Sequence, residues 1–199
     1  MKTIDYYNDN ADSFCEDTIN ANMTSLYELF EKHLSPGGHI LDCGCGSGRD
    51  SKYFLDKGYE VTAMDASEEL CKRAAALIGR EVACMTFMEI SYENMFDGVW
   101  ACSSLLHEKK ENLNTVLKKI AKATKTNGII YVSFKYGDFE GERNGRYFTD
   151  LTEASAWELL KDVPMLVIEE EWITGDVRPD RGDERWLNLI LRKSNINYI

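Results

Sequence analysis

The 199-residue sequence has no hydrophobic run that approaches the ~18 apolar residues of a membrane-spanning helix. It also has no excess of basic residues, because its formal net charge is −11 at pH 7. A broad basic surface for nucleic acid is therefore not expected, although a local basic pocket is compatible with this charge. The amino-terminal residues contain no apolar core of a signal peptide, so we expect a cytoplasmic protein with no membrane contact.

Metal ligands at a recognisable spacing are missing as well. The six cysteines are even in number, yet free thiols are the expectation for a cytoplasmic chain of this size. Cys43 and Cys45 have only His39 as a nearby third ligand, so no metal site is expected. Cys84 and Cys102 lie in strand-like segments and are predicted to be small core residues.

The most informative segment is residues 39–50, where a short apolar strand is followed by closely spaced glycines. Gly44, Gly46 and Gly48 predict a turn that residues with a Cβ tolerate poorly. A helix is expected to begin directly after this turn. The turn and the helix amino-terminus would bring backbone N–H groups and a positive dipole end to one point, which suits a polar, partly anionic ligand.

The glycine spacing narrows the choice of ligand. A dinucleotide-binding turn has the pattern G-x-G-x-x-G, and its third glycine falls on Arg49 when the count starts at Gly44. Residues 59–64 predict a second strand, and Asp65 follows at its tip, where a carboxylate can hold a ribose diol. The pattern therefore disfavours NAD, and Asp42 before the loop would favour an ammonium group on the ligand.

Three segments resemble a known family. Residues 41–48 (Leu-Asp-Cys-Gly-Cys-Gly-Ser-Gly) and 61–67 (Val-Thr-Ala-Met-Asp-Ala-Ser) resemble motifs I and II of the class I S-adenosylmethionine-dependent methyltransferases. Residues 96–107 resemble the fourth-strand motif of that family. Residues 133–137 and 176–188 resemble a bacterial subgroup often described as tellurite-resistance-like methyltransferases. The resemblance covers nearly the whole chain, and it implies S-adenosylmethionine as the cofactor.

The order of the expected elements agrees with an α/β fold. Strands that alternate with helices predict a Rossmann-like, doubly wound sheet, here of seven strands. The last two strands are separated only by residues 175–184, so they are expected to pair antiparallel in an otherwise parallel sheet. The expected helices are 22–34, 49–57, 67–79, 109–125 and 153–161. Ser67 and Thr152 are the expected caps of the third and fifth of these helices, and Gly79 ends the third. The expected strands are the short one before the glycine loop, 59–64, 82–85, 96–102, 129–134, one within 163–174, and 185–193, with a turn at 127–128 and a charged loop at 137–149.

One domain is expected over residues 1–199, with 1–34 as a helical cap and 35–199 as the Rossmann-like core. Residues 1–18 combine acidic and aromatic side chains and predict a short helix. Its aromatic rings either pack on the body or close a lid over the cofactor, as amino-terminal helices do in the resembled family. A lid also needs apolar contacts when it is shut, so both interpretations remain open.

Ligands of a doubly wound sheet bind at the carboxyl ends of its strands. By the resemblance, Asp65 accepts the ribose hydroxyls, the glycine loop holds the methionine part, and Met85 and Phe87 enclose the adenine. Core packing is the alternative for these last two residues. The predicted cofactor contacts are Tyr7, Asp42, Gly44, Cys45, Gly46, Gly48, Asp65, Ala66, Ser67, Met85, Thr86, Phe87 and Ser103.

Methyl transfer from a sulfonium is an in-line displacement, so the protein mainly positions the acceptor and removes its proton if it has one. His107 is the candidate catalytic base, and a structural histidine bonded to a loop carbonyl is the alternative. The predicted substrate contacts are Arg146, Tyr147, Arg178 and Arg185, because guanidinium groups bind carboxylate or phosphate. The alternative for these arginines is ion pairing with neighbouring acidic residues.

These observations predict a methyltransferase that acts on a small, acidic molecule, as a monomer or a homodimer. The chain has almost no room for a separate substrate domain, and its charge disfavours nucleic acid. Three alternatives remain: a protein that binds S-adenosylmethionine without turnover, an NAD-dependent oxidoreductase, and a methyltransferase for a nucleotide or an RNA end. The acceptor atom is left open.

Overall fold

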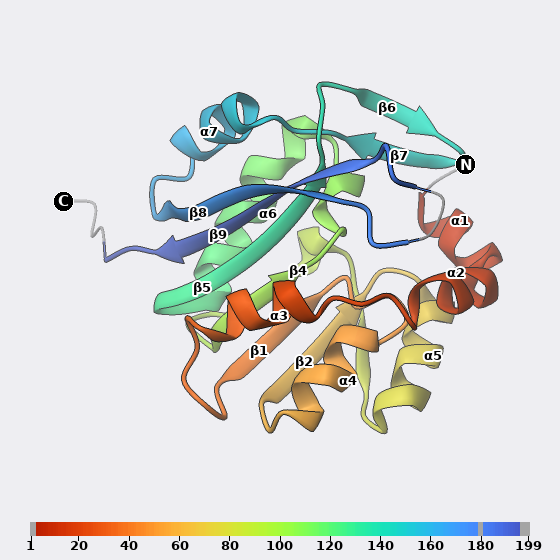
Figure 1. Cartoon of the computed structure of the whole chain (residues 1–199). Coiled ribbons are helices and arrows are strands. Elements are labelled where there is room, and N and C mark those ends of the chain that lie inside the picture. Colours follow the sequence, from red (N-terminus) through yellow and green to blue (C-terminus); the bar gives the residue numbers. More distant parts are fainter. Residues whose placement is uncertain (1–2, 179–180, 196–199) are drawn as a thin grey trace.

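The computed structural model describes residues 3–178 and 181–195 of the chain. Its central feature is a seven-stranded sheet in the order β3-β2-β1-β4-β5-β9-β8 (Figure 1). Strands β1 to β5 run parallel, and β9 is antiparallel to both of its neighbours, which confirms the predicted architecture. The strands are β1 (His39–Cys43), β2 (Glu60–Asp65), β3 (Val82–Cys84), β4 (Phe96–Ala101), β5 (Thr124–Lys135), β8 (Leu166–Gly175) and β9 (Arg185–Lys193).

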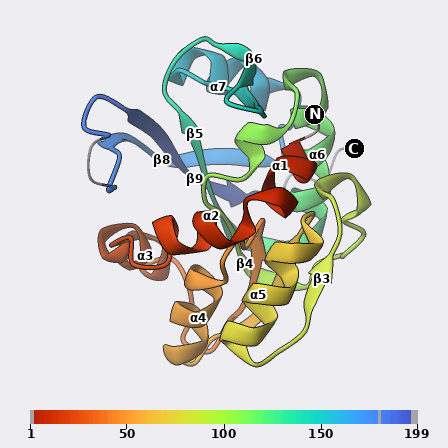
Figure 2. The ribbon, with the colours of Figure 1, turned by 90° about the vertical axis from the view of Figure 1, so that its right-hand side faces the viewer.

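Helices cover both faces of this sheet, as Figures 1 and 2 show. Ile40 and Leu41 are neighbours on β1 and point to opposite faces, yet both are completely buried. Such two-sided burial is typical of a central parallel strand between helix layers. Helices α3 (Thr24–Glu31), α4 (Arg49–Asp56) and α5 (Glu68–Ile78) pack on the Ile40 face, and α6 (Lys110–Ala123) and α7 (Glu153–Lys161) pack on the Leu41 face.

Two helices begin at the side-chain caps that the sequence predicts. The Ser67 hydroxyl accepts a hydrogen bond from the Leu70 amide at the start of α5, and Gly79 ends this helix in the left-handed region with φ 67°. Thr152 caps α7 in the same way by accepting from the Ser155 amide. The cap of α5 matters for the site, because Ser67 follows Asp65 at the carboxyl end of β2.

The amino-terminal segment forms two helices, α1 (Thr3–Asp9) and α2 (Ala11–Thr18), where the sequence predicted one. They cross the carboxyl ends of the strands between α5 and a small hairpin (Figure 2). The Ser67 hydroxyl donates to the Asn8 side chain at 2.7 Å, and the Tyr147 amide donates to the Thr3 hydroxyl at 2.9 Å. Helix α1 therefore contacts both sides of the region where a ligand is expected.

The hairpin replaces the loop predicted for residues 137–149, so that prediction was wrong. Strands β6 (Glu140–Arg143) and β7 (Arg146–Thr149) pair antiparallel through a two-residue turn. Asn144 and Gly145 in this turn have φ of 50° and 77°. Asn-Gly is the preferred sequence for such a turn because both residues tolerate positive φ, and this signal outweighs the charge of the segment.

Two smaller expectations also fail. The turn expected at 127–128 lies inside β5, where Asn127 has φ 63° and the pairing register with β4 shifts. Cys84 is exposed and not a core residue, because β3 is an edge strand that α5 covers only in part.

Replacement of Gly48 by alanine tests the packing between α4 and α5. Gly48 has φ 82°, and an added Cβ would lie 3.0 Å from the Ala74 Cα. Strain and overpacking together are expected to lower the free energy of unfolding by roughly 2–4 kcal/mol in urea denaturation. Gly58→Ala is the matched control, since φ is 89° and nothing lies within 4 Å, so about 1 kcal/mol is expected there. Equal losses in the two variants would contradict the close approach to Ala74.

Candidate active site

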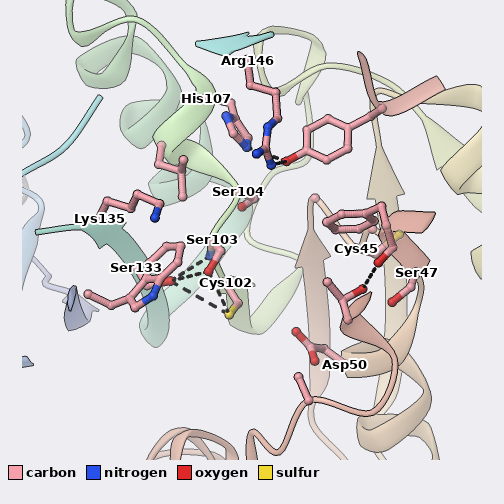
Figure 3. A pocket seen from close by; sticks show the side chains of 18 of the residues that line it. Cys45, Ser47, Asp50, Cys102, Ser103, Ser104, His107, Ser133, Lys135 and Arg146 are labelled. Carbon is pink, nitrogen blue, oxygen red and sulfur yellow. Dashed lines mark hydrogen bonds between the residues drawn. The ribbon is translucent and has the colours of Figure 1, made fainter. Parts of the chain in front are cut away.

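A cavity of about 500 Å³ opens at the carboxyl ends of the central strands. Figure 3 shows side chains that line it, with Cys45 and Ser47 from the glycine loop on one side and Lys135 and Ser133 on the other. His107 and Arg146 lie together at one end. The lining therefore joins the loops after β1 and β4 to the end of β5 and to the β6–β7 hairpin, as a doubly wound sheet requires.

The glycine loop is shaped by a neighbouring loop. A Cβ on Gly44 would lie 2.5 Å from the Ser104 Cβ, and the Ser104 hydroxyl donates to the Cys43 carbonyl at 2.6 Å. The amides of Gly44 and Cys45 both donate to the Met64 carbonyl at 2.9 Å. Only glycine allows this approach at position 44, and the loop is thereby held against β2 and the loop after β4.

Asp65 lies at the tip of β2 with its carboxylate held by the backbone. One oxygen accepts from the Gly46 amide at 2.9 Å and the other from the Ser67 amide at 2.9 Å. Burial raises the pKa of this carboxyl group, and the backbone hydrogen bonds oppose that effect. Each carboxylate oxygen retains a further lone pair, so the group can accept a vicinal diol in addition. Ala66 and Ser67 line the cavity beside it.

The loop after β3 brings one of the two predicted adenine contacts to the cavity. Thr86 and Phe87 line it, and a capping box between Thr86 and Glu89 orders the short 3₁₀-helix η1 (Phe87–Glu89). Met85 is not part of the lining, because its side chain packs on the core with its sulfur 4.0 Å from the Tyr92 hydroxyl. The structure therefore places Met85 against the core and not in the lining, as the packing alternative describes.

Asp42 and Gly48 also lie outside the lining. Asp42 is 2% exposed and accepts from the Ser51 hydroxyl at 2.6 Å beneath the loop. Burial, and then the nearby Asp50 carboxylate, raise its pKa to about 8. Gly48 faces Ala74 of α5. Both residues support the loop from behind, and the structure does not bring them into the lining with the other predicted cofactor contacts.

Asp50 and Arg49 do line the cavity, although the sequence did not predict them as site residues. Asp50 accepts hydrogen bonds from the Tyr27 hydroxyl and the Trp100 indole, and it pairs with Arg49. Arg49 also donates to the Thr18 carbonyl at 3.1 Å, which ties the end of α2 to the glycine loop. In the sequence these two residues directly follow the glycine loop, and this position predicted only the start of a helix and not a place in the site.

His107 ends the 3₁₀-helix η2 (Leu105–His107), and both of its ring nitrogens have partners. Nδ1 lies 2.7 Å from the Tyr147 carbonyl, and Nε2 lies 2.8 Å from the Tyr7 hydroxyl. A carbonyl only accepts, so Nδ1 carries the proton and Nε2 accepts from Tyr7. Burial, with the nearby Arg146 cation, lowers the pKa of His107 to about 4. The bond to a backbone carbonyl matches the structural alternative, and the role as a base stays a prediction.

Most cations of the cavity are paired with carboxylates. Arg178 pairs with Asp176, Arg143 with Asp150, and Arg181 and Lys135 with Glu184. Ion pairing with acidic residues is the alternative that the sequence left open for the arginines. The charges largely cancel, although Arg178 still lines the cavity.

Arg146 differs from these cations, because no residue within 3–178 and 181–195 offers it a carboxylate. Its guanidinium carbon lies 4.7 Å from the Tyr6 ring centroid and 5.2 Å from that of Phe148. Its Nη1 donates to the Tyr7 hydroxyl at 3.4 Å, and its Nε is buried without a partner. Aromatic faces satisfy a cation only in part, so this guanidinium retains capacity for an anion.

Two predicted substrate contacts lie elsewhere. Arg185 is exposed, while its strand neighbour Trp186 lines the cavity, because adjacent residues on β9 point to opposite faces. The Tyr147 hydroxyl donates to Glu140 at 2.9 Å outside the cavity, and only its backbone reaches His107. The structure therefore does not bring these two side chains to the cavity. Ser133 and Asn188 line the cavity and were not predicted.

The described part of the chain, residues 3–178 and 181–195, contains neither a metal-binding cluster nor a membrane-spanning helix. No group of three His, Cys, Asp or Glu side chains there is arranged to hold a metal ion. No helix in this part of the chain has the length and apolar character needed to cross a membrane.

Comparison with known proteins identifies the domain. Residues 41–132 match the methyltransferase domain family. The 1,6-didemethyltoxoflavin-N1-methyltransferase of Burkholderia thailandensis, solved with S-adenosylhomocysteine bound, is 26% identical with a TM-score of 0.75, over 96% of this chain and 85% of that protein. The chain has the fold and the cofactor-binding domain of a class I S-adenosylmethionine-dependent methyltransferase. S-adenosylmethionine is the cofactor that this methyltransferase domain uses.

Curated relatives agree with this family. The putative methyltransferase YqeM of Bacillus subtilis is 28% identical over 119 residues, which are 54% of this chain and 48% of that protein. A malonyl-[acyl-carrier protein] O-methyltransferase of Enterobacter lignolyticus is 29% identical over 97 residues, 46% of this chain and 36% of that protein. The chain thus spans at most about half the length of these two relatives.

The Asp65 carboxylate provides a direct test of the cofactor site in this methyltransferase domain. Asp65→Asn keeps the shape of the side chain but removes the charge and one acceptor. Hydrogen bonds to a charged group contribute about 1.5–3 kcal/mol, so affinity for S-adenosylhomocysteine should fall roughly 10- to 100-fold in calorimetric titration. Asp56→Asn is the control, because Asp56 pairs with Lys52 on the exposed side of α4. Unchanged affinity in Asp65→Asn would remove Asp65 from the cofactor site.

His107 makes stability depend on pH. Its folded pKa of about 4 lies below the ordinary value of 6.5, so the unfolded chain takes up the proton first as the pH falls. The folded state is stabilised by keeping His107 neutral, and this contribution to the free energy of unfolding is complete above pH 6.5 and is lost as the pH falls toward 4. The titratable groups that face the ring are the Arg146 guanidinium, which is charged, and the Tyr7 hydroxyl, which is neutral. Over this interval, wild type should lose on the order of 2 kcal/mol more than His107→Gln in urea denaturation. Parallel pH curves for the two proteins would show that His107 is not held neutral.

Proposed function

We propose that this protein is an S-adenosylmethionine-dependent methyltransferase that acts on a small, acidic molecule by in-line displacement. One observation carries the proposal: Arg146, a cation without a carboxylate partner among the described residues, lines the same cavity as the Asp65 carboxylate and the glycine loop. Arg146 is half-buried, and a cation in such a position that lacks an anion favours a ligand that brings one.

S-adenosylmethionine supplies a methyl group on a positively charged sulfur, which is already activated toward nucleophiles. Asp65 would hold the ribose diol, and the backbone of the glycine loop would lie along the methionine part. Phe87 would pack against the adenine, and Arg49 could hold the cofactor carboxylate with its remaining N–H groups. Phe14 and Leu106 line the cavity and exclude water. These residues contribute mainly by positioning, which can supply several kcal/mol.

The size of the cavity supports a small substrate. A volume of about 500 Å³ lies within the range typical of cofactor and small-ligand pockets. The Burkholderia neighbour methylates 1,6-didemethyltoxoflavin, a small molecule. The resemblance to the tellurite-resistance-like subgroup is carried by residues 133–137 and 176–188 and keeps oxyanions among the candidates. Fold alone does not fix the substrate.

We further propose that the helices of residues 1–34 act as a cap over this cavity. Tyr7 bonds to His107, and Arg49 bonds to the Thr18 carbonyl. Phe14 lies against the glycine loop, since a Cβ on Gly46 would be 3.0 Å from its ring. A cap with contacts to both sides of the cavity would close over bound cofactor and substrate.

Two other functions use the same cofactor site. A protein that only binds S-adenosylmethionine would contain the same glycine loop and Asp65. A methyltransferase for a nucleotide or an RNA end would use the arginines, but the net charge of −11 disfavours a polyanion. RNA binding would weaken steeply with salt, whereas a small acid would show little salt dependence.

Calorimetric titration with S-adenosylmethionine, S-adenosylhomocysteine and NAD tests the cofactor, and methyl-labelled S-adenosylmethionine tests turnover. We expect micromolar binding of the first two, no binding of NAD, and transfer of label to a small acidic compound in a metabolite mixture. Binding of NAD alone would overturn the proposal. Binding of S-adenosylmethionine with no transfer and no cofactor hydrolysis would favour the binding protein instead.

A further inference from the structure

The cavity contains a histidine that has no free nitrogen. Nδ1 of His107 donates to the Tyr147 carbonyl, and Nε2 accepts from the Tyr7 hydroxyl at 2.8 Å. A substrate hydroxyl or ammonium group therefore finds no lone pair on this ring while α1 is in place. The Tyr7 phenol is itself a donor here, and burial raises its pKa, so it is not a base.

The acidic side chains of the described lining are engaged as well. Asp50 accepts from Tyr27 and Trp100 and pairs with Arg49, and Asp65 accepts two backbone amides. Asp176 pairs with Arg178 and accepts from the Trp186 indole, while Glu184 pairs with Lys135 and Arg181. Glu108 accepts from Asn112 of α6 at 3.3 Å. Asp65 and Glu108 keep unused lone pairs, but within residues 3–178 and 181–195 no carboxylate of the cavity lies within ion-pair distance of Arg146. No carboxylate base is therefore in place for an acceptor that this cation holds.

We propose that the methyl acceptor is a carboxylate oxygen of the substrate, held by Arg146, and that the product is a methyl ester. This inference rests on the proposed function and names its acceptor. A carboxylate needs no base, because it is already ionised at neutral pH. It also supplies the anion that Arg146 lacks, in a planar form that matches a guanidinium edge.

The surroundings of Arg146 favour a carboxylate over a phosphate. Tyr6 and Phe148 contact the guanidinium, so a ligand approaches it through its N–H edge. A phosphate dianion would bring more charge and more bound water into this aromatic setting, at a larger desolvation cost. A carboxylate fits the edge with two parallel hydrogen bonds.

The transfer balances without a proton. A lone pair of the carboxylate oxygen forms the bond to the methyl carbon, and the carbon–sulfur bond breaks with its electron pair left on sulfur. The negative carboxylate and the positive sulfonium become a neutral ester and a neutral thioether. Arg146 would orient the carboxylate by bonding to one lone pair of each oxygen, and one oxygen would attack with its remaining lone pair. His107 would act as a positioning residue that fixes Tyr7 beside Arg146.

Binding of benzoate, with benzamide as its uncharged analogue, tests the anion site in the presence of saturating S-adenosylhomocysteine. We expect benzoate to bind at least tenfold more tightly than benzamide to wild type, and Arg146→Gln to abolish this difference. Arg146→Lys should retain part of it, because charge remains without the planar fork. Arg192→Gln, which removes an arginine paired with Glu169 at the other end of the sheet, should behave as wild type.

Two outcomes of this titration are distinguishable. If S-adenosylhomocysteine binds but benzoate binds no better than benzamide, or equally well to Arg146→Gln, the carboxylate site is overturned and the proposed function stands. If S-adenosylhomocysteine does not bind, the proposed function itself fails. Binding of S-adenosylhomocysteine to Arg146→Gln also shows that this variant is folded.

The chemical nature of the transferred label tests the acceptor atom. Label transferred from methyl-labelled S-adenosylmethionine to a metabolite mixture should be released as methanol by mild alkali, because esters hydrolyse and N-, S- and ether-linked methyl groups do not. The transfer rate should be flat from about pH 6 to pH 9, above the titration of a carboxyl group. Alkali-stable label, or a tenfold rise in rate per pH unit, would overturn the inference.

Discussion

The structure depends on the absence of side chains in the loop after β1. Three elements that are distant in the sequence approach the backbone of this loop so closely that a methyl group would collide with them. The loop after β4, the cap helix α2 and helix α5 are each positioned by one glycine. The approaching residues are Ser104 at Gly44, Phe14 at Gly46 and Ala74 at Gly48. The same contacts therefore define one wall of the cavity and attach the cap to the core.

Electrostatic pairing determines which charges in the cavity remain available to a ligand. Buried or half-buried ions are costly unless they are paired, and Arg143, Arg178 and Lys135 each have a carboxylate partner. Asp50 is stabilised by Arg49 and two neutral donors. Arg146 is the exception among the described cations that line the cavity. Its aromatic neighbours stabilise the cation without neutralising it. Both proposals about the substrate depend on this charge that no carboxylate neutralises.

The amino-terminal helices and the hairpin meet over the cavity, although they are more than a hundred residues apart in the sequence. Tyr7 lies between His107 and Arg146, and it hydrogen-bonds to both. A movement of α1 would free Nε2 of His107 and one N–H of Arg146 together. Opening of the cap would therefore expose the His107 nitrogen and the Arg146 N–H group at the same time.

Local patterns in the sequence determined the sheet, the glycine loop, Asp65 and the Ser67 cap, because each depends on residues adjacent in the chain. The tertiary structure decided which side chains reach the cavity. Arg185 and Trp186 differ by one position on β9 and face opposite ways, and Met85 turns into the core beside Tyr92. Ion pairing is likewise a matter of distance in space, which no spacing in the sequence reveals. The sequence therefore predicted arginines as substrate contacts, but only the folded chain distinguished Arg146 from the arginines already paired with a carboxylate.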